Sequence, residues 1–236
     1  MPNAPNPIAV AIDESELGAA QSLLRKLAGE IGWIKLGMEF FFAQGRSGYE
    51  QLARLGLPVF LDLKLHDIPN SVAAALNSLM RLEPRPGIVN VHASGGRAMM
   101  EAAADAVKGR AKLIAVTVLT SLEESDLADI GLDGRSSSAD HALMMAKLAK
   151  SSGLDGVVCS PHDVAQIKGT LGKDFLAIVP GVRPEGSGTG DQKRVATPGA
   201  ARKAGADLLV IGRPITRAKD PQTAARAIAK EVMDAG

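Results

Sequence analysis

Short, nearly continuous apolar runs alternate along this chain with stretches in which apolar residues recur at helical spacing. Runs of Val, Ile and Leu without polar alternation are typical of strands that are buried on both faces of a parallel sheet. Eight such runs predict strands at residues 8–13, 33–38, 59–64, 88–92, 113–120, 156–160, 175–180 and 208–213.

The stretches between these runs carry apolar stripes with the spacing of amphipathic helices. Helices are expected over residues 17–31, 72–82 and 143–149, with weaker stripes at 99–107, 164–171 and 224–232. Ser15 precedes the first stripe as a candidate N-terminal cap. Glycine is favoured in the left-handed position that ends a helix, and the glycines expected to do so are Gly32, Gly109, Gly153 and Gly205.

Eight strand–helix units fit into 236 residues at about 30 residues each, which is the size of a βα repeat. No Pro- or Ser-rich linker and no change in composition divides the chain. We therefore predict an α/β fold with a single domain over residues 1–236, a (β/α)8 TIM barrel in which residues 1–7 form a loose N-terminal tail. An open, doubly wound sheet is the less favoured alternative.

The composition limits which binding partners and which cellular compartment are expected. The net charge of +1 gives no argument for a nucleic acid or an anionic membrane surface as partner. No apolar run approaches the roughly 18–20 residues of a membrane span, and the first residues lack the basic and apolar regions of a signal peptide. The single cysteine, Cys159, permits no internal disulfide. We therefore expect a cytoplasmic protein.

The segment 59–70 places charges at the end of an apolar run. Asp62 and Lys64 lie two residues apart, so a regular strand would place both side chains on one face. Asp67 follows just past the expected strand end, beside a Pro-Asn pair that indicates the start of a helix. Because burying such charges is costly unless they are paired or used, this segment predicts a functional site.

Active sites of (β/α)8 barrels lie at the C-terminal ends of the strands. Polar residues gather at those expected ends: Asp13, Lys35, Asp62, Lys64, Asp67, His92, Thr120, Ser160, Arg183 and Arg213. The two arginines follow the last two strands, where barrels commonly bind phosphate, and Gly212 opens a short helix whose N–H groups suit an anion. The glycine-rich segment 185–194 is expected to close on a ligand. The alternative is an ordinary turn at Gly212 and an ordinary connecting loop.

Other polar residues are interpreted as structural. His92 is expected to be a hydrogen-bonded scaffold residue, and His66 to point away from the barrel mouth. His141 and His162 open helices and are expected on the surface. Cys159 is expected to be a small buried group.

Short stretches of the chain carry a family pattern: residues 11–13, 34–37, 60–70, 91–96, 117–121, 158–160, 180–184, 190–192 and 211–214. Through them the chain resembles the orotidine 5′-monophosphate decarboxylases of the short bacterial type over almost all of its length. The Asp-x-Lys-x-x-Asp core that begins at Asp62 also occurs in a sister family of keto-gulonate-phosphate decarboxylases and aldolases. Lys35 distinguishes the two, because the sister family carries a glutamate there that is used with magnesium. Gln192 and the extended loop around it also favour the nucleotide enzyme.

The resemblance implies decarboxylation of orotidine 5′-monophosphate (OMP) to uridine 5′-monophosphate (UMP) and CO2, in de novo pyrimidine biosynthesis. It implies that Lys64 protonates C6 and that Asp62 faces the substrate carboxylate. Lys35 and Asp67 would complete an alternating charged network that stabilises the carbanion-like transition state. No metal or organic cofactor is implied.

The resemblance also implies which residues bind the substrate: Asp13, Lys35, Thr120, Ser121, Arg183, Gln192, Gly212 and Arg213. Asp13 and Lys35 would contact the ribose, and Thr120 and Ser121 would lie near the pyrimidine. The equivalent of Asp67 serves the partner subunit's site in this family, so a homodimer is implied.

Two other function classes stay open. One is a magnesium-dependent sugar-phosphate lyase or decarboxylase on the same scaffold, which Lys35 disfavours. The other is a non-catalytic barrel that binds a phosphate ligand, which would be expected to lack a member of the charged network.

Overall fold

The strands close into one parallel barrel. The computed structural model describes residues 6–132, 136–184 and 195–235, and each strand in them pairs with its neighbours in the chain, β8 returning to β1. The strands are β1 (Ile8–Ile12), β2 (Trp33–Gly37), β3 (Val59–Leu65), β4 (Ile88–His92), β5 (Lys112–Val116), β6 (Gly156–Val158), β7 (Leu176–Val179) and β8 (Leu208–Ile211). The predicted barrel is confirmed, and the open-sheet alternative is wrong.

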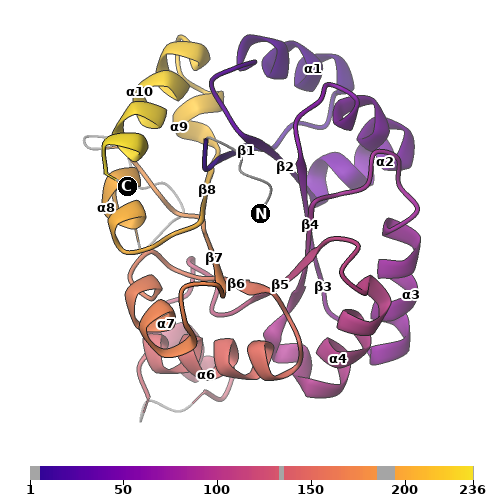
Figure 1. Cartoon of the computed structure of the whole chain (residues 1–236), viewed down its shortest axis with the longest axis vertical. Helices are drawn as coiled ribbons and strands as arrows, with labels where there is room; N and C mark the ends of the chain where they lie inside the picture. Colours follow the sequence, from indigo (N-terminus) through magenta and orange to yellow (C-terminus); the bar gives the residue numbers. More distant parts are fainter. Residues whose placement is uncertain (1–5, 133–135, 185–194, 236) are drawn as a thin grey trace.

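Helices surround the barrel on its outside (Figure 1). They are α1 (Leu17–Lys26), α2 (Met38–Ala53), α3 (Pro69–Leu79), α4 (Gly96–Val107), α6 (Ser138–Ser151), α7 (Val164–Leu171), α8 (Pro198–Lys203) and α10 (Pro221–Asp234). Shorter helical segments are η1 (Ala93–Gly95), α5 (Glu124–Asp129) and α9 (Arg213–Thr216). Within the described ranges, no helix combines the length and the apolar character that crossing a bilayer requires.

The hydrophobic pattern does not predict α2, α5 or α8. In α2 the reason is visible, because Gly45 takes φ 59° and ψ −156° and so interrupts the helical period. The strand predicted at 113–120 is also too long, since β5 ends at Val116. Thr117 still donates hydrogen bonds to Val158 O from its backbone N–H and its hydroxyl, and the chain leaves the ladder after it.

Three of the four predicted helix-ending glycines are confirmed. Left-handed φ values of 70°, 85° and 105° occur at Gly109, Gly153 and Gly205. The prediction for Gly32 is wrong, because α1 ends earlier and Gly29 takes the left-handed conformation instead. Gly32 is required for space, since a Cβ there would lie 1.9 Å from Asn6 O.

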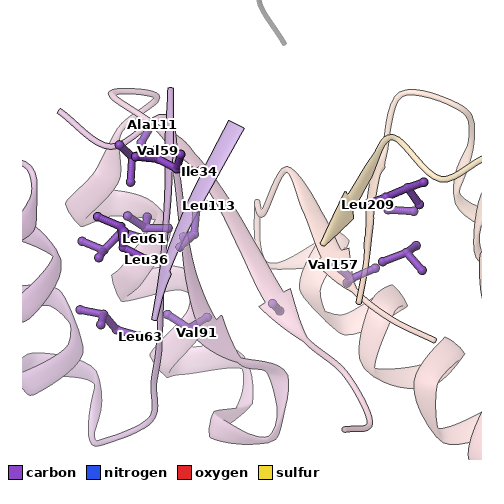
Figure 2. Packing of buried hydrophobic residues seen from close by; sticks show 14 of the residues in the cluster. Ile34, Leu36, Val59, Leu61, Leu63, Val91, Ala111, Leu113, Val157 and Leu209 are labelled. Atoms are coloured by element: carbon purple, nitrogen blue, oxygen red, sulfur yellow. The ribbon is translucent and has the colours of Figure 1, made fainter. Parts of the chain in front are cut away.

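Side chains of the strands alternate between two cores. One core fills the barrel interior and comprises Ala9, Ala11, Trp33, Phe60, Ile88, Ile114, Ile178, Leu208 and Val210. The other includes Leu61, Leu63 and Leu209, which Figure 2 shows on the side of the strands that faces the helices. In β2, β3 and β4, a polar residue lies two positions after an apolar residue of the interior core. The interior core therefore forms the floor under a polar site.

Candidate active site

Charged side chains meet at the C-terminal ends of β1, β2 and β3. Lys35 is 8% exposed, and its Nζ lies 3.4 Å from both Asp13 Oδ1 and Asp62 Oδ2. Gly37 leaves the space for this ammonium group, because a Cβ there would lie 3.0 Å from Lys35 Nζ. Lys35 therefore joins an exposed carboxylate at the barrel rim to a buried one.

Asp62 is the centre of the cluster and is 7% exposed. Its Oδ1 accepts hydrogen bonds from Lys64 Nζ at 2.7 Å and from Asn90 Nδ2 at 2.7 Å. Burial on its own raises the pKa of Asp62, but the charges of Lys35 and Lys64 outweigh it. Together with the hydrogen bonds from Lys64 and Asn90, they hold this pKa below its usual value. Asp62 is therefore ionised at neutral pH.

The charges of the cluster cancel within the chain. Asp13, Lys35, Asp62 and Lys64 alternate in sign along the contacts. Removing one partner of a buried pair leaves an uncompensated charge, which is far more costly than burying the matched pair. The cluster can therefore be partly buried without a net charge.

β3 leaves the regular ladder at the site. It pairs with β4 up to Leu61 and again at Leu65, so three residues of β3 lie opposite Asn90 alone. Lys64, the last of the three, has a φ of 52°. This left-handed conformation costs roughly 1–3 kcal/mol in a residue with a side chain. Asn90 Oδ1 accepts a hydrogen bond from the Lys64 N–H at 2.8 Å, in place of the ladder partner that the bulge removes.

Asn90 is a site residue that was not predicted from the sequence. It is 1% exposed and lies inside the apolar run of β4. The available signal was its spacing, because it follows the interior residue Ile88 by two positions and so shares its face.

Asp67 stands apart from the cluster within one chain. It is exposed, and its Oδ1 accepts a hydrogen bond from the Ile68 N–H at 2.6 Å. No ion pair joins Asp67 to another residue in the described part of the chain. Within one chain, Asp13 joins the contacts of Lys35, Asp62 and Lys64, and the place of Asp67 in the network stays a prediction that requires a second copy.

Two arginines lie at the ends of β7 and β8. Arg213 begins α9 directly after Gly212, and Arg183 Nη1 donates to Val182 O at 2.9 Å. Partial burial, and then the positive charge of Arg213, lower the pKa of Arg183, so the two cations lie near one another. A Cβ on Gly212 would lie 3.5 Å from Asp13 Oδ2. An arginine pair suited to a phosphate therefore adjoins the lysine–aspartate cluster.

The other predicted site residues differ in burial. Thr120 follows β5 and is 8% exposed, whereas Ser121 is exposed. Ser160 is fully buried and its N–H donates to Asp163 Oδ2 at 3.3 Å, which indicates a structural turn. Gln192 and the whole segment 185–194 lie outside the described residues.

Two histidines lie beside the cluster and a third is buried elsewhere. The rings of His66 and His92 have centroids 5.5 Å apart. Burial, followed by the charges of His66 and Lys64, lowers the pKa of His92. The surface prediction for His141 is wrong, because it is 6% exposed and its Nε2 has no hydrogen-bond partner in the described structure. The predictions that His162 is exposed and Cys159 buried are confirmed.

Fold and site together define a (β/α)8-barrel protein with an internally neutralised lysine–aspartate cluster beside two arginines. The model of the orotidine 5′-phosphate decarboxylase / HUMPS family matches residues 6–228. The chain belongs to this family.

Individual relatives and solved structures cover nearly the whole chain. Relatives named orotidine 5′-phosphate decarboxylase include one from Erythrobacter litoralis, 54% identical, covering 94% of this chain and 97% of its own length. Another from Rhodospirillum rubrum is 50% identical, with coverages of 97% and 94%. The crystal structure of orotidine 5′-phosphate decarboxylase from Lactobacillus acidophilus is 37% identical and has a TM-score of 0.82. It covers 96% of this chain and 99% of that chain.

Proposed function

We propose that the protein is an orotidine 5′-phosphate decarboxylase, a carboxy-lyase that converts OMP to UMP and CO2 without a cofactor. The observation that carries this proposal is the contact geometry of Lys64, Asp62 and Lys35 at the barrel mouth. The names of relatives at 54% and 50% identity support the substrate. A cytoplasmic location agrees with a chain that has a single, buried cysteine.

Lys64 is proposed as the proton donor. The bond between C6 and the carboxylate breaks, CO2 leaves with the carboxylate atoms, and the electron pair stays on C6. Lys64 Nζ then donates its proton to C6 and regains one from solvent. Because Nζ lies 2.7 Å from Asp62 Oδ1, its position is fixed before the negative charge develops.

Asp62 is proposed to act on the substrate carboxylate as well. Two like charges about 4 Å apart repel by roughly 4 kcal/mol at an effective dielectric of about 20. This repulsion disappears as CO2 leaves. It is smaller than the ~8–23 kcal/mol by which enzymes lower barriers, so stabilisation of the C6 carbanion by Lys64 is the larger contribution.

The proposed substrate contacts follow the order of the groups in a nucleotide. Arg183, Gly212 and Arg213 bind the phosphate, and Asp13 and Lys35 bind the ribose. The 3.5 Å separation between Asp13 Oδ2 and a Cβ position on Gly212 supports adjacent phosphate and ribose positions. Thr120 and Ser121 contact the pyrimidine, and Gln192 links the segment 185–194 to the ligand.

A homodimer is proposed in which Asp67 serves the partner's site. Asp67 is exposed, as are Ile68 at 66% and Phe42 at 76%. An apolar groove of about 420 Å³ lies nearby between α2, β3 and α3, and the residues that line it include Phe41, Phe42, Leu63, Leu65, Ala75 and Leu79. Because Leu65 of this groove is two residues from Asp67 in the chain, a second copy that covers the groove would also receive Asp67.

The magnesium-dependent sugar-phosphate activity of the sister family is less well supported. The lysine at position 35 lies 3.4 Å from each of two carboxylates. A positive charge there opposes a metal cation, and Lys35 cannot be a carboxylate ligand.

The proposed activity is tested with chelator-treated protein. We expect OMP to be converted in the presence of chelator, and a keto-gulonate phosphate to stay unreacted with magnesium. The opposite result, turnover of the sugar phosphate that chelator abolishes, would assign the protein to the sister activity. Binding of UMP without turnover of either substrate would favour the non-catalytic barrel.

Site sharing is tested by mixing Lys64→Ala and Asp67→Ala proteins, each of which we expect to be inactive. A mixed dimer contains one site with both Lys64 and Asp67, so an equal mixture should recover about a quarter of the wild-type activity. No recovery after demonstrated subunit exchange would contradict the shared site.

A further inference from the structure

Asn90 binds two different parts of the neighbouring strand with one side-chain amide. Its Nδ2 donates to Asp62 Oδ1 at 2.7 Å, and its Oδ1 accepts from the Lys64 N–H at 2.8 Å. The partners define the orientation of the amide, because an ionised carboxylate only accepts and a backbone N–H only donates. Asn90 thereby connects the carboxylate and the ammonium-bearing residue of the cluster.

The bulge in β3 explains why Lys64 needs this partner. Three residues of β3 lie opposite Asn90 alone, so the Lys64 N–H has lost its ladder acceptor. A buried N–H without a partner is unfavourable, and the φ of 52° at Lys64 is unfavourable for a residue with a side chain. The Asn90 carbonyl accepts a hydrogen bond from this N–H and thereby stabilises the left-handed conformation of Lys64. A change of φ at Lys64 would free its side chain to leave the position in which Nζ lies 2.7 Å from Asp62 Oδ1.

We propose that Asn90 is a positioning residue for the decarboxylation. It holds Lys64 in its left-handed conformation and fixes the carboxylate plane of Asp62, so that both groups meet the substrate in a reactive arrangement. This inference rests on the proposed function, because the step it serves is proton donation by Lys64. Asn90 acts through these two residues.

Two substitutions separate a positioning role from a purely structural one. Asn90→Ala removes both hydrogen bonds. Asn90→Asp keeps an acceptor for the Lys64 N–H but places a second carboxylate against Asp62, and such a pair takes up a proton more readily than a lone carboxylate. Once protonated, the introduced carboxyl can donate to Asp62 as the amide does. The matched control is Val89→Ala, because Val89 is 1% exposed on the same strand but belongs to the core that faces the helices.

The experiment measures kcat and KM for OMP over a range of pH, with folding checked by circular dichroism. We expect Asn90→Ala to lower kcat by about 10- to 100-fold with less than about a threefold change in KM. Val89→Ala should keep the wild-type kcat. The kcat of Asn90→Asp relative to wild type should rise as the pH falls from about 8 to about 6.

A folded Asn90→Ala protein with wild-type kcat would overturn the inference. So would a ratio of Asn90→Asp to wild-type kcat that stays flat across the pH range, and this second measurement decides if Asn90→Ala does not fold. A folded wild-type protein that fails to decarboxylate OMP would overturn the proposed function, and this inference with it. An active wild type with unaffected variants would overturn the inference alone.

Discussion

Lysine–aspartate contacts occur at both ends of the barrel, but their geometry differs. At the N-terminal ends of the strands, Lys168 Nζ lies 2.5 Å from Asp207 Oδ2 and Lys112 Nζ lies 2.6 Å from Asp155 Oδ1. Asp207 also accepts a hydrogen bond from the Ala177 N–H, and Asp155 accepts one from the backbone of β5. These pairs therefore reinforce the regular ladder between neighbouring strands.

At the C-terminal ends, the same residue types interrupt the ladder. Asp62 contacts two lysines and an asparagine, and Lys64 lies in a bulge with a left-handed φ. The N-terminal pairs form without a shared carboxylate and without a left-handed lysine. The difference teaches that departure from local regularity, more than the presence of charge, distinguishes the proposed catalytic end of this barrel from its N-terminal end.

Among substitutions that keep the lysines in place, the largest effect should come from neutralising an aspartate at each end of the barrel. Asp62→Asn leaves two lysines without their shared partner, so we expect kcat to fall by about 10²–10³-fold. Asp207→Asn should leave kcat within about twofold of wild type, because Asp207 is remote from reacting groups. Steady-state kinetics with OMP measure both. Equal losses for the two variants would contradict the distinction.

The next effect concerns the arginine pair. Arg213→Ala removes a charge-assisted donor worth about 1.5–3 kcal/mol to a charged ligand, so KM for OMP should rise by about 10- to 100-fold. Inhibition by UMP should weaken by a similar factor, whereas inhibition by uridine, which lacks the phosphate, should not change. Parallel weakening of both inhibitors would show that Arg213 does not contact phosphate.

At the N-terminal end, the expected effect is on stability. Asp207→Ala leaves the Ala177 N–H without its acceptor and Lys168 without its carboxylate partner, so the free energy of unfolding should fall by about 1–3 kcal/mol. Urea denaturation measures it, and kcat per folded molecule should be unchanged. A loss of activity without a loss of stability would contradict the view that the N-terminal end of the barrel serves stability alone.

A smaller effect concerns the pH dependence of stability. The pKa of His92 is lowered in the folded protein, chiefly by burial. The unfolded chain therefore binds a proton first as the pH falls through the ordinary histidine value of 6.5, and stability is lost between that value and the lower folded pKa. His92→Asn should reduce the loss of stability at acid pH, measured as the urea midpoint at each pH. A urea midpoint that depends on pH as in the wild type would show that His92 does not contribute.

The smallest effect should come from the surface pair between Glu30 and Arg226, whose atoms Oε1 and Nη2 lie 2.6 Å apart. This pair joins the first and last strand–helix units outside the barrel. Because exposed ion pairs contribute little, Glu30→Gln should leave activity unchanged and alter the urea midpoint only slightly. A large loss of stability would contradict the view that the pairing of β1 with β8 is what keeps the barrel closed.

Much of the fold could be predicted because strands buried on both faces have a distinct composition. The runs that became β3 and β4 contain hardly any polar residue before the site, so the charges of Asp62 and Lys64 were conspicuous. Helix α2 could not be predicted, because Gly45 interrupts its period. The burial of His141 depends on how α6 packs, which its own sequence does not record.

The site was harder to predict where it depends on contacts between strands. Asn90 is one polar residue in an apolar run, and its role follows only from the register shift between β3 and β4. The alternation of a regular strand predicted that Lys64 and Asp62 meet, and they do, although a bulge brings them together. Asp67 has no such contact within one chain, and its proposed role needs a second copy.

The most direct test follows the loss of the orotate ultraviolet band when chelator-treated protein is given OMP. Wild type, Lys64→Ala and the N-terminal control Lys168→Met are compared at equal folded concentration. We expect wild type and Lys168→Met to convert the substrate at similar rates, and Lys64→Ala to be slower by about 10⁴-fold or more. Near-wild-type conversion by folded Lys64→Ala, or no conversion by folded wild type, would contradict the account.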